Sequence, residues 1–190
     1  MAVTEIFIGN GRSLNAELPG KNVWLHVTDK LYQTLPLYSN MKTTGVYIYA
    51  KDIQVKSRKA IIHAESEVKN EYKKALTVGY EVEVVDLDGK SVATFNSEPV
   101  VIAKGETATL SAEAPLSDLH FWSWGYGYLY KIKTRLIVDG DVMDEVVTRT
   151  GFRKTRFGEG KVWINDRVLQ FKGYAQRTSN EWPGVGLSVP

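Results

Sequence analysis

Hydrophobic and polar residues alternate with a period of two along several short segments of the chain. In residues 59–70 the hydrophobic positions are Ala60, Ile62, Ala64 and Val68, and the polar positions between them are His63, Glu65, Glu67 and Lys69. Residues 76–84 repeat this pattern. Successive side chains of a strand point to opposite faces, so the alternation predicts half-buried β-strands.

Two-residue turn signals join these strands into hairpins. Asp88-Gly89 leads from the second segment into a strand at 91–95, and Asp139-Gly140 separates strands at 128–138 and 142–152. The Asp-Gly pair is typical of tight turns that need a positive φ, so both connections are predicted to be antiparallel hairpins.

Further strand-like segments at 99–103 and 107–114 bring the total to about seven strands between Gly45 and Phe157. Seven short strands within about 100 residues are typical of an immunoglobulin-like β-sandwich. No window has hydrophobic positions at helical spacing behind a cap, so almost no helix is expected. The predicted fold class is therefore all-β, an immunoglobulin-like antiparallel sandwich with fragments of neighbouring domains on either side.

The two ends of the chain have a different pattern from the middle. Residues 22–28 and 31–38 are predicted to be strands that lack enough partners of their own. After Phe157, residues 161–165 and 167–173 predict a third hairpin around Asn165-Asp166. Both ends are therefore expected to be parts of larger neighbours.

Composition and charge exclude several classes of protein. The chain has 24 Lys and Arg against 22 Asp and Glu, a formal net charge of +2, and its basic residues are scattered, so a nucleic-acid partner is not expected. It has no cysteine, which excludes disulfides and thiolate metal sites. The first residues do not have the pattern expected of a signal peptide, and no run of about 18 apolar residues occurs, so no membrane partner is expected, and the localisation stays unknown.

The sequence assigns no catalytic residue, metal ligand or cofactor. His26, His63 and His120 are far apart and do not have the spacing of a metal site. An acidic group around the second hairpin lacks the full ligand set of a calcium loop and is interpreted as a solvated turn. Its members are Asp139, Asp141, Asp144 and Glu145.

Residues 121–130 form a run rich in aromatic side chains. The members Trp122, Tyr128 and Tyr130 are predicted to fill the core or a domain contact, because aromatic side chains dominate burial. Trp124 and Tyr126 are flanked by glycine and are predicted to be exposed. These two are candidate aromatic sugar contacts, because the faces of pyranose rings pack on flat aromatic rings.

Several motifs, in order, resemble the family 2 glycoside hydrolases, the group of β-galactosidases, β-glucuronidases and β-mannosidases. The motifs are Phe121-Trp122-Ser123, Tyr128-Leu129-Tyr130, Asp144-Glu145, Gly151-Phe152-Arg153 and the stretch 163–173, with weaker similarity at 23–27 and 44–48. There are also departures: Trp124 and Gly127 stand where the family has prolines, and Asp166 stands where it has a glycine. The chain is therefore interpreted as a divergent member, and no sugar is assigned.

The resemblance implies three parts: the end of a sugar-binding domain at 1–43, the immunoglobulin-like sandwich at 44–158, and the first hairpin and strand of a catalytic barrel at 159–190. It also implies a retaining mechanism with two carboxylates about 5 Å apart on late strands of that barrel. A barrel of this kind needs at least about 200 residues, so the catalytic carboxylates are expected outside the chain.

Residues just after the first barrel strand would lie at the substrate-binding face of such a barrel. The resemblance therefore makes four residues candidate substrate contacts in a complete enzyme: Arg177, Asn180, Glu181 and Trp182.

The leading hypothesis is a non-catalytic spacer that fixes the sugar-binding and barrel domains of the same polypeptide, with carbohydrate as the partner of the whole enzyme. A freestanding carbohydrate-binding or adhesion module that uses Trp124 and Tyr126 is the alternative, and a scaffold for oligomer contacts is a third. Strands without partners at 23–27 and 168–171 also predict self-association, because open strand edges attract other chains.

Overall fold

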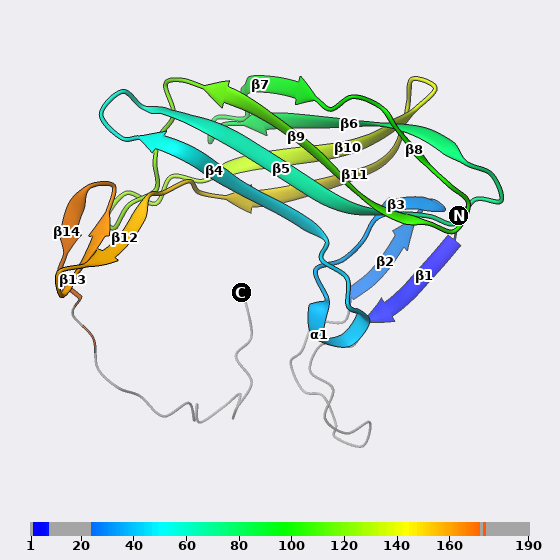
Figure 1. Cartoon of the computed structure of the whole chain (residues 1–190), viewed down its shortest axis with the longest axis horizontal. Helices are drawn as coiled ribbons and strands as arrows, with labels where there is room; N and C mark the ends of the chain where they lie inside the picture. Colours follow the sequence, from blue (N-terminus) through cyan, green and yellow to red (C-terminus); the bar gives the residue numbers. More distant parts are fainter. Residues whose placement is uncertain (1, 8–23, 172, 174–190) are drawn as a thin grey trace, which may run out of the picture. The chain divides into compact units, whose positions relative to one another are not determined.

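The computed structural model describes residues 2–7, 24–171 and 173 (Figure 1). The chain divides into two units, one formed by Asp29–Gln170 and the other by Met1–Thr28 together with Phe171–Pro190. In the second of these, strands β1 (Ala2–Phe7) and β2 (Trp24–Thr28) form an antiparallel pair with an irregularity between Val3 and Glu5. The strand predicted at 22–28 is thus present, and it pairs with a strand that the sequence pattern did not indicate.

The unit Asp29–Gln170 contains a first antiparallel sheet built around strand β5. One edge of β5 pairs with β9 from Ala60 to Lys69, so β4 and β3 share the other edge. The strands of this sheet are β3 (Leu31–Gln33), β4 (Val46–Gln54), β5 (Lys59–Asn70) and β9 (Thr107–Leu116).

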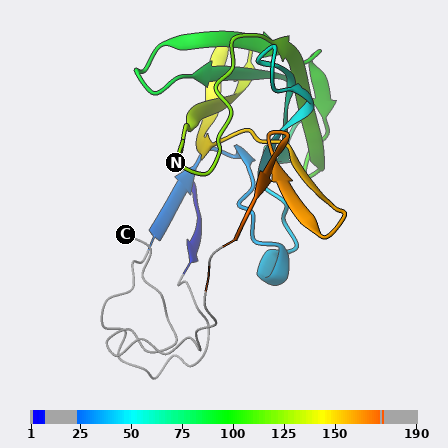
Figure 2. The same cartoon turned by 90° about the vertical axis from the view of Figure 1, so that its left-hand side faces the viewer.

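A second antiparallel sheet is built around β6 and β10. Strand β10 lies between β11 and β6, and the other edge of β6 is shared by β7 and β8. Its strands are β6 (Leu76–Val85), β7 (Ser91–Asn96), β8 (Val100–Ile102), β10 (Tyr130–Val138) and β11 (Asp141–Thr150). Figures 1 and 2 show the two sheets as stacked layers. The predicted sandwich is confirmed: its two sheets have nine strands, and eight of them, β4 to β11, lie in the range for which about seven were predicted.

The core lies between the two sheets and follows the predicted alternation. All four hydrophobic positions predicted on one face of β5 are buried, and so are Val78, Tyr80, Val82 and Val84 of β6. From the second sheet Ile132 and Leu136 of β10 complete the layer. Because removal of apolar surface from water is the main favourable term in folding, this layer is the chief source of stability of the sandwich.

Both predicted Asp-Gly hairpins are confirmed by the pairing of β6 with β7 and of β10 with β11. At the second turn Asp139 and Gly140 have φ values of 54° and 91°, as a turn with two left-handed residues requires. Aspartate tolerates this conformation better than most residues because its short side chain can form local hydrogen bonds.

The prediction of a strand at 31–38 is correct for Leu31–Gln33 and wrong for the residues after Gln33. The expectation that this strand lacks partners is also wrong. Strand β3 pairs with β5, and Leu31 is fully buried in the core. Pro36 has no N–H group to continue a ladder, and a single helical turn, α1 (Tyr38–Met41), follows. No helix in the described part of the chain is long and apolar enough to cross a membrane.

Gly45 lies between α1 and β4, where the backbone comes close to that of Pro36. Its φ is +67°, and a Cβ atom built on it would lie 2.6 Å from the backbone nitrogen of Pro36. Only glycine fits both conditions, because other residues rarely adopt this φ and would collide with the Pro36 backbone.

After β11 the chain forms a three-stranded meander in the order β12-β13-β14. Its strands are β12 (Thr155–Gly158), β13 (Lys161–Ile164) and β14 (Arg167–Leu169). The hairpin predicted around Asn165-Asp166 is confirmed, with φ values of 49° and 63° at these residues. Since β14 and β2 both have partners, the expectation of unpaired strands at these positions is wrong; the self-association derived from it stays a prediction.

Candidate functional site

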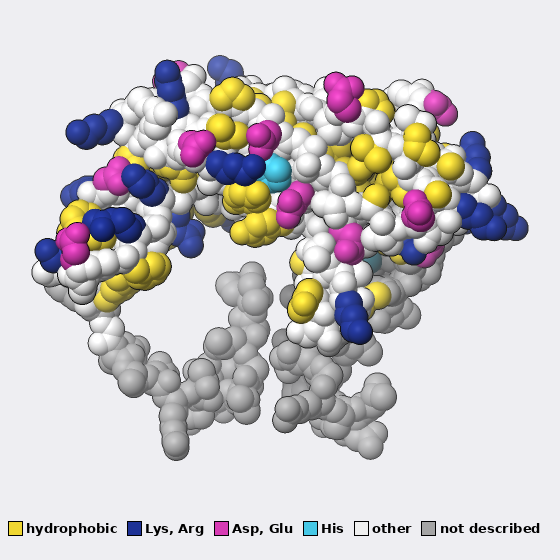
Figure 3. All heavy atoms as spheres, viewed as in Figure 1, with side chains coloured by type: hydrophobic (Ala, Val, Ile, Leu, Met, Phe, Trp, Pro, Cys, Tyr) yellow, Lys and Arg dark blue, Asp and Glu magenta, His cyan; other side chains and the backbone are white. Residues whose placement is uncertain are grey.

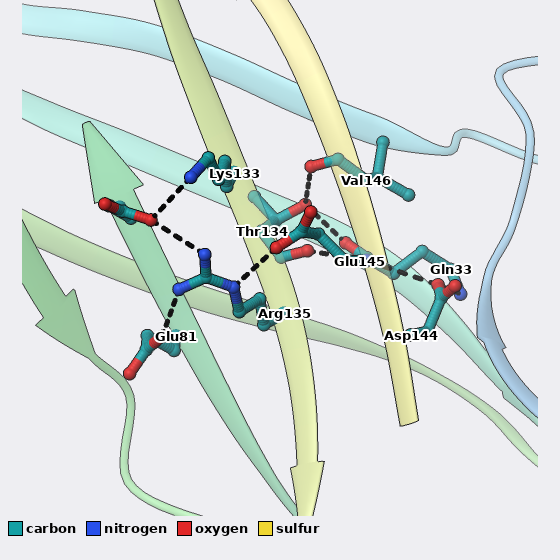
Figure 4. A network of polar contacts seen from close by, with 9 residues as sticks. Gln33, Glu81, Lys133, Thr134, Arg135, Asp144, Glu145 and Val146 are labelled. Atoms are coloured by element: carbon teal, nitrogen blue, oxygen red, sulfur yellow. Dashed lines mark hydrogen bonds and ion pairs between the residues drawn. The ribbon is translucent and has the colours of Figure 1, made fainter. Parts of the chain in front are cut away.

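A buried group of polar side chains joins the two sheets at Gln33 (Figure 4). The Gln33 side-chain amide donates to the Thr134 carbonyl at 3.0 Å and to Asp144 Oδ2 at 3.3 Å. Its oxygen accepts hydrogen bonds from Ser66 Oγ at 2.8 Å and from Thr134 Oγ1 at 2.7 Å. Tyr80 Oη lies 2.7 Å from Ser66 Oγ. We call Gln33, Ser66, Tyr80, Thr134 and Asp144 the inter-sheet polar cluster.

Burial perturbs the acidity of two members of the inter-sheet polar cluster. It raises the pKa of Tyr80 to about 12. It also raises the pKa of Asp144, although the backbone N–H of Gln33 donates to this carboxylate at 2.8 Å and partly offsets the effect. Asp144 is therefore an inter-sheet contact, and its interpretation as part of a solvated turn is wrong.

The start of the unit Asp29–Gln170 is held by a second set of polar contacts. Asp29 Oδ1 accepts hydrogen bonds from the Tyr72 hydroxyl at 2.6 Å and from the Leu31 backbone N–H at 3.1 Å. Burial acts to raise the pKa of Asp29, but these hydrogen bonds outweigh it and lower the pKa below its ordinary value. Four residues after Asp29, Gln33 belongs to the inter-sheet polar cluster.

Near the end of the same unit, Asn165 fixes the meander to the sandwich. Its backbone N–H donates to the Lys154 carbonyl at 2.9 Å, and its side-chain oxygen accepts from the Lys154 N–H at 3.0 Å. Its side-chain amide donates to the Trp122 carbonyl at 3.0 Å. Asn165 is buried, so three hydrogen bonds are concentrated on one residue in a site from which water is largely excluded.

An arginine occupies the outer face of the second sheet beside the inter-sheet polar cluster (Figure 4). The guanidinium of Arg135 contacts Glu81 at 2.8 Å, Glu83 at 2.7 Å and Glu145 at 2.6 Å. These carboxylates raise the pKa of Arg135, and hydrogen bonds from Arg135 and Lys133 lower the pKa of Glu83 against the opposing effect of burial. We call Arg135 and its three glutamates the arginine cluster.

Other carboxylates on the outer surface are also paired. Glu113 of β9 contacts Lys51 at 2.7 Å and His63 at 2.9 Å, and hydrogen bonds from both lower its pKa. The His63 ring lies 4.8 Å from the ring of Tyr49. Figure 3 shows acidic and basic side chains interspersed on the face in view, with hydrophobic side chains between them.

Two surface hollows beside the β4–β5 turn are lined by few side chains that could act as catalytic acids or bases. Their volumes are about 400 Å³ and about 720 Å³. Asp52 is the only carboxylate among the described residues that line them. No group of three or more His, Asp or Glu side chains in the described part of the chain is arranged to hold a metal ion.

The aromatic run contains a small exposed hairpin, formed by residues 123–126. Ser123 and Tyr126 exchange two backbone hydrogen bonds of 2.9 Å, and Gly125 between them has a φ of +81°. This geometry is that of a type II turn, in which the third residue needs a positive φ. Trp124 is 79% exposed and Tyr126 is 47% exposed, as predicted.

The remaining aromatic residues of the run pack inward. Tyr130 is buried and lies 5.6 Å from the ring of Phe152. Trp122 is half-buried, and Arg153 lies over its ring at 5.3 Å. Tyr128 stacks on His120 with 4.5 Å between ring centroids.

The other sequence-predicted candidates lie outside the described residues: Arg177, Asn180, Glu181 and Trp182. Sequence reasoning missed the inter-sheet polar cluster because Gln33 is 101 and 111 positions from Thr134 and Asp144. The one local signal was the placement of polar Ser66 and Thr134 at inward-facing positions of otherwise hydrophobic strands.

Comparison with known proteins gives consistent matches over most of the chain. Residues 46–153 match the family described as Glycosyl hydrolases family 2. A β-glucuronidase of Formosa agariphila is 33% identical over 90% of the chain, and a β-galactosidase of Thermoanaerobacter pseudethanolicus is 25% identical over 57%. A solved structure of a β-glucuronidase from glycoside hydrolase family 2 superposes on 82% of the chain with a TM-score of 0.75 and 31% identity.

The chain corresponds to only a small part of each of these proteins. It spans 17% of the Formosa agariphila protein, 14% of the Thermoanaerobacter pseudethanolicus protein and 16% of the chain in the solved structure.

Proposed function

Because the chain belongs to family 2 of the glycosyl hydrolases, we propose that it is the non-catalytic spacer of a larger glycosidase. In this proposal the sandwich holds a sugar-binding domain and a catalytic barrel of the same polypeptide in a fixed relation. The whole enzyme hydrolyses a β-glycosidic bond. The most similar of the three relatives named above is a β-glucuronidase, so a β-glucuronide is the first substrate to test.

The observation that carries the proposal is the fixing of the chain at both ends of the unit Asp29–Gln170. At the start, Asp29 is held by Tyr72, and Gln33 is bonded to both sheets. Near the end, Asn165 is bonded to Lys154 and to Trp122. A spacer transmits a fixed geometry only if the segments that enter and leave it cannot move independently, and buried hydrogen bonds supply this restraint.

The same contacts support a spacer that includes more than the sandwich strands. Strand β3 belongs to a sheet of the sandwich, and Asn165 bonds the meander to the sandwich. In this proposal the whole unit Asp29–Gln170 acts as the spacer. The domain limits at 44 and 158 stay a prediction.

A second line of support comes from the carboxylates of the described residues. A retaining glycosidase needs an acid with a raised pKa and a free nucleophile about 5 Å apart in a substrate cleft. Glu81, Glu83 and Glu145 share Arg135, and Glu113 is paired with Lys51. Asp144 has a raised pKa, but Gln33 occupies its oxygen and the residue lies between the sheets.

Hydrolysis of nitrophenyl glycosides by the purified 190-residue chain tests the proposal. We expect no release of nitrophenol from the β-glucuronide or the β-galactoside above the buffer rate. The matched variants are Asp52→Asn, at the surface hollows, and Glu113→Gln, at the paired surface carboxylate. Turnover by the unaltered chain that either variant abolishes would refute a non-catalytic role.

A further inference from the structure

The hairpin at residues 123–126 presents an aromatic side chain that the sandwich does not use. The indole of Trp124 is 79% exposed, and no hydrogen bond or ring contact joins it to the described residues. A type II turn fixes its backbone. In the described part of the chain the Trp124 ring is therefore open to a ligand.

A strained turn region lies behind the hairpin. Arg58 and Asp118 both have a φ of 57°, and the Leu119 N–H donates to the Arg58 carbonyl at 3.0 Å. The guanidinium of Arg58 donates to the carbonyls of Leu119 at 3.1 Å and Asp118 at 2.6 Å. A left-handed conformation is unfavourable for a residue such as arginine, and strain of this kind is concentrated at functional sites.

Arg58 also determines which nitrogen of the His120 ring accepts a hydrogen bond. Its guanidinium has donors only, so at 3.1 Å the His120 Nε2 atom must be the acceptor. The ring proton is then on Nδ1, which donates to Tyr126 Oη at 2.8 Å. The hydroxyl hydrogen of Tyr126 is therefore directed away from His120 and remains available as a donor.

The position of His120 is fixed from two further directions. Its backbone N–H donates to the hydroxyl of Tyr130 at 2.8 Å. Its ring stacks on Tyr128 with an interplanar angle of 15°. The Tyr126 hydroxyl is thus pre-oriented, which reduces the entropy cost of binding a ligand to it.

We propose that the hairpin 123–126 is a carbohydrate-binding site that takes one pyranose ring. The indole face of Trp124 packs on the C–H face of the sugar, and the Tyr126 hydroxyl donates a hydrogen bond to a sugar oxygen. His120 is a positioning residue that acts through Tyr126. The site goes beyond the spacer function and does not depend on it.

The size of the exposed surface favours a sugar over a protein partner. A stable protein interface uses about 800 Å² on each partner and about 20–30 residues. The hairpin offers two aromatic side chains, and the glycines at 125 and 127 add no further side chain beside them. Two aromatic rings with one directed donor match the dimensions and chemistry of a monosaccharide.

Nuclear magnetic resonance of the tryptophan indole N–H groups in the 190-residue chain tests the proposal. The probes are methyl β-D-glucuronide and methyl β-D-galactoside at millimolar concentration. We expect the Trp124 indole signal to shift saturably with at least one probe. Trp124→Ala lacks this signal, so its affinity is measured from the proton signals of the sugar; it should bind about tenfold or more weakly, which corresponds to the loss of one aromatic contact. Phe157→Ala is the matched control, because the Phe157 ring is 75% exposed and does not belong to the hairpin. The affinity of this variant for the sugar should equal that of the unaltered chain.

The role of His120 has its own readout. Tyr126→Phe and His120→Ala should each weaken binding, and His120→Ala should have no further effect in the Tyr126→Phe background. A residue that merely maintains the fold would weaken binding in both backgrounds.

Two results would overturn the carbohydrate site. One is the absence of a saturable shift with both probes, or an affinity, measured from the proton signals of the sugar, that is unchanged in Trp124→Ala. The other is a concentration-dependent dimer that Trp124→Ala dissociates and neither sugar affects, which would assign the hairpin to a protein contact. Neither result bears on turnover of nitrophenyl glycosides. Failure of the carbohydrate-site proposal is therefore distinguishable from failure of the spacer proposal.

Discussion

Thr134 and Arg135 are consecutive residues of β10, yet they belong to two polar clusters with different physical consequences (Figure 4). Thr134 points between the sheets and is fully buried, whereas Arg135 points outward and its side chain is 21% exposed. The period of two in a strand separates them onto opposite faces. The comparison shows that the contribution of a cluster to stability does not follow from its number of polar contacts. Burial determines how much each contact contributes.

The inter-sheet polar cluster contributes stability mainly through the cost of leaving it incomplete. A buried donor or acceptor without a partner loses its hydration and gains nothing in return. In the arginine cluster, solvent screens the ion pairs and can replace a lost partner. The first cluster is therefore expected to be sensitive to substitution, and the second to be tolerant.

The largest expected effect is that of Gln33→Ala. The change leaves the hydroxyls of Ser66 and Thr134 and the Thr134 carbonyl without this partner in a buried site, so we expect a loss of about 3 kcal/mol in the free energy of unfolding. Urea denaturation measures it. Gln54→Ala, at an exposed position of β4, is the matched control and should change stability by less than about 0.5 kcal/mol. Equal effects of the two substitutions would show that the buried hydrogen bonds of Gln33 contribute no more to stability than an exposed side chain does.

A smaller effect is expected for Arg135→Ala. We predict a loss of about 0.5–1 kcal/mol at low ionic strength, because partly exposed ion pairs contribute little and three glutamates lose their shared cation. The loss should decrease at high salt concentration, since screening weakens both attraction and repulsion. Arg149→Ala, at an exposed position of β11, is the control. A loss as large as that for Gln33→Ala, independent of salt, would contradict the account.

The smallest effect is expected for Asp144→Asn and appears in the pH dependence of stability. Burial raises the pKa of Asp144 in the folded state, so its contribution is fully present below the unfolded pKa and is lost as pH rises through the folded pKa. The amide cannot ionise, so the variant should lack this decrease. Urea denaturation across the acidic range measures it, with Asp139→Asn in the exposed turn as control. If the decrease in stability with rising pH is unchanged in Asp144→Asn, another group causes it.

The sequence predicted those features that depend on residues close together in the chain. The alternation in β5, the Asp-Gly turns and the exposure of Trp124 and Tyr126 beside glycines were all recoverable, because strand period and turn chemistry are local. The family was also recoverable, because several motifs occur in a fixed order.

What could not be predicted depends on contacts that are distant in sequence. Gln33 in a short segment gives no sign that it bonds to Thr134, and Asp144 beside acidic neighbours resembles part of a solvated turn. The role of His120 depends on Arg58, 62 positions away. Such contacts are decided by how the sheets stack, which the pattern of one strand does not encode.

The central claim is that the chain is fixed where it enters and leaves the unit Asp29–Gln170, and amide hydrogen exchange of the 190-residue chain tests it most directly. The amides of Gln33 and Asn165 donate to Asp144 and to the Lys154 carbonyl, so we predict protection within about tenfold of that of core Ile62. Exchange of either amide as fast as that of exposed Leu87 in the β6–β7 turn would show that the end moves independently and would contradict the spacer function.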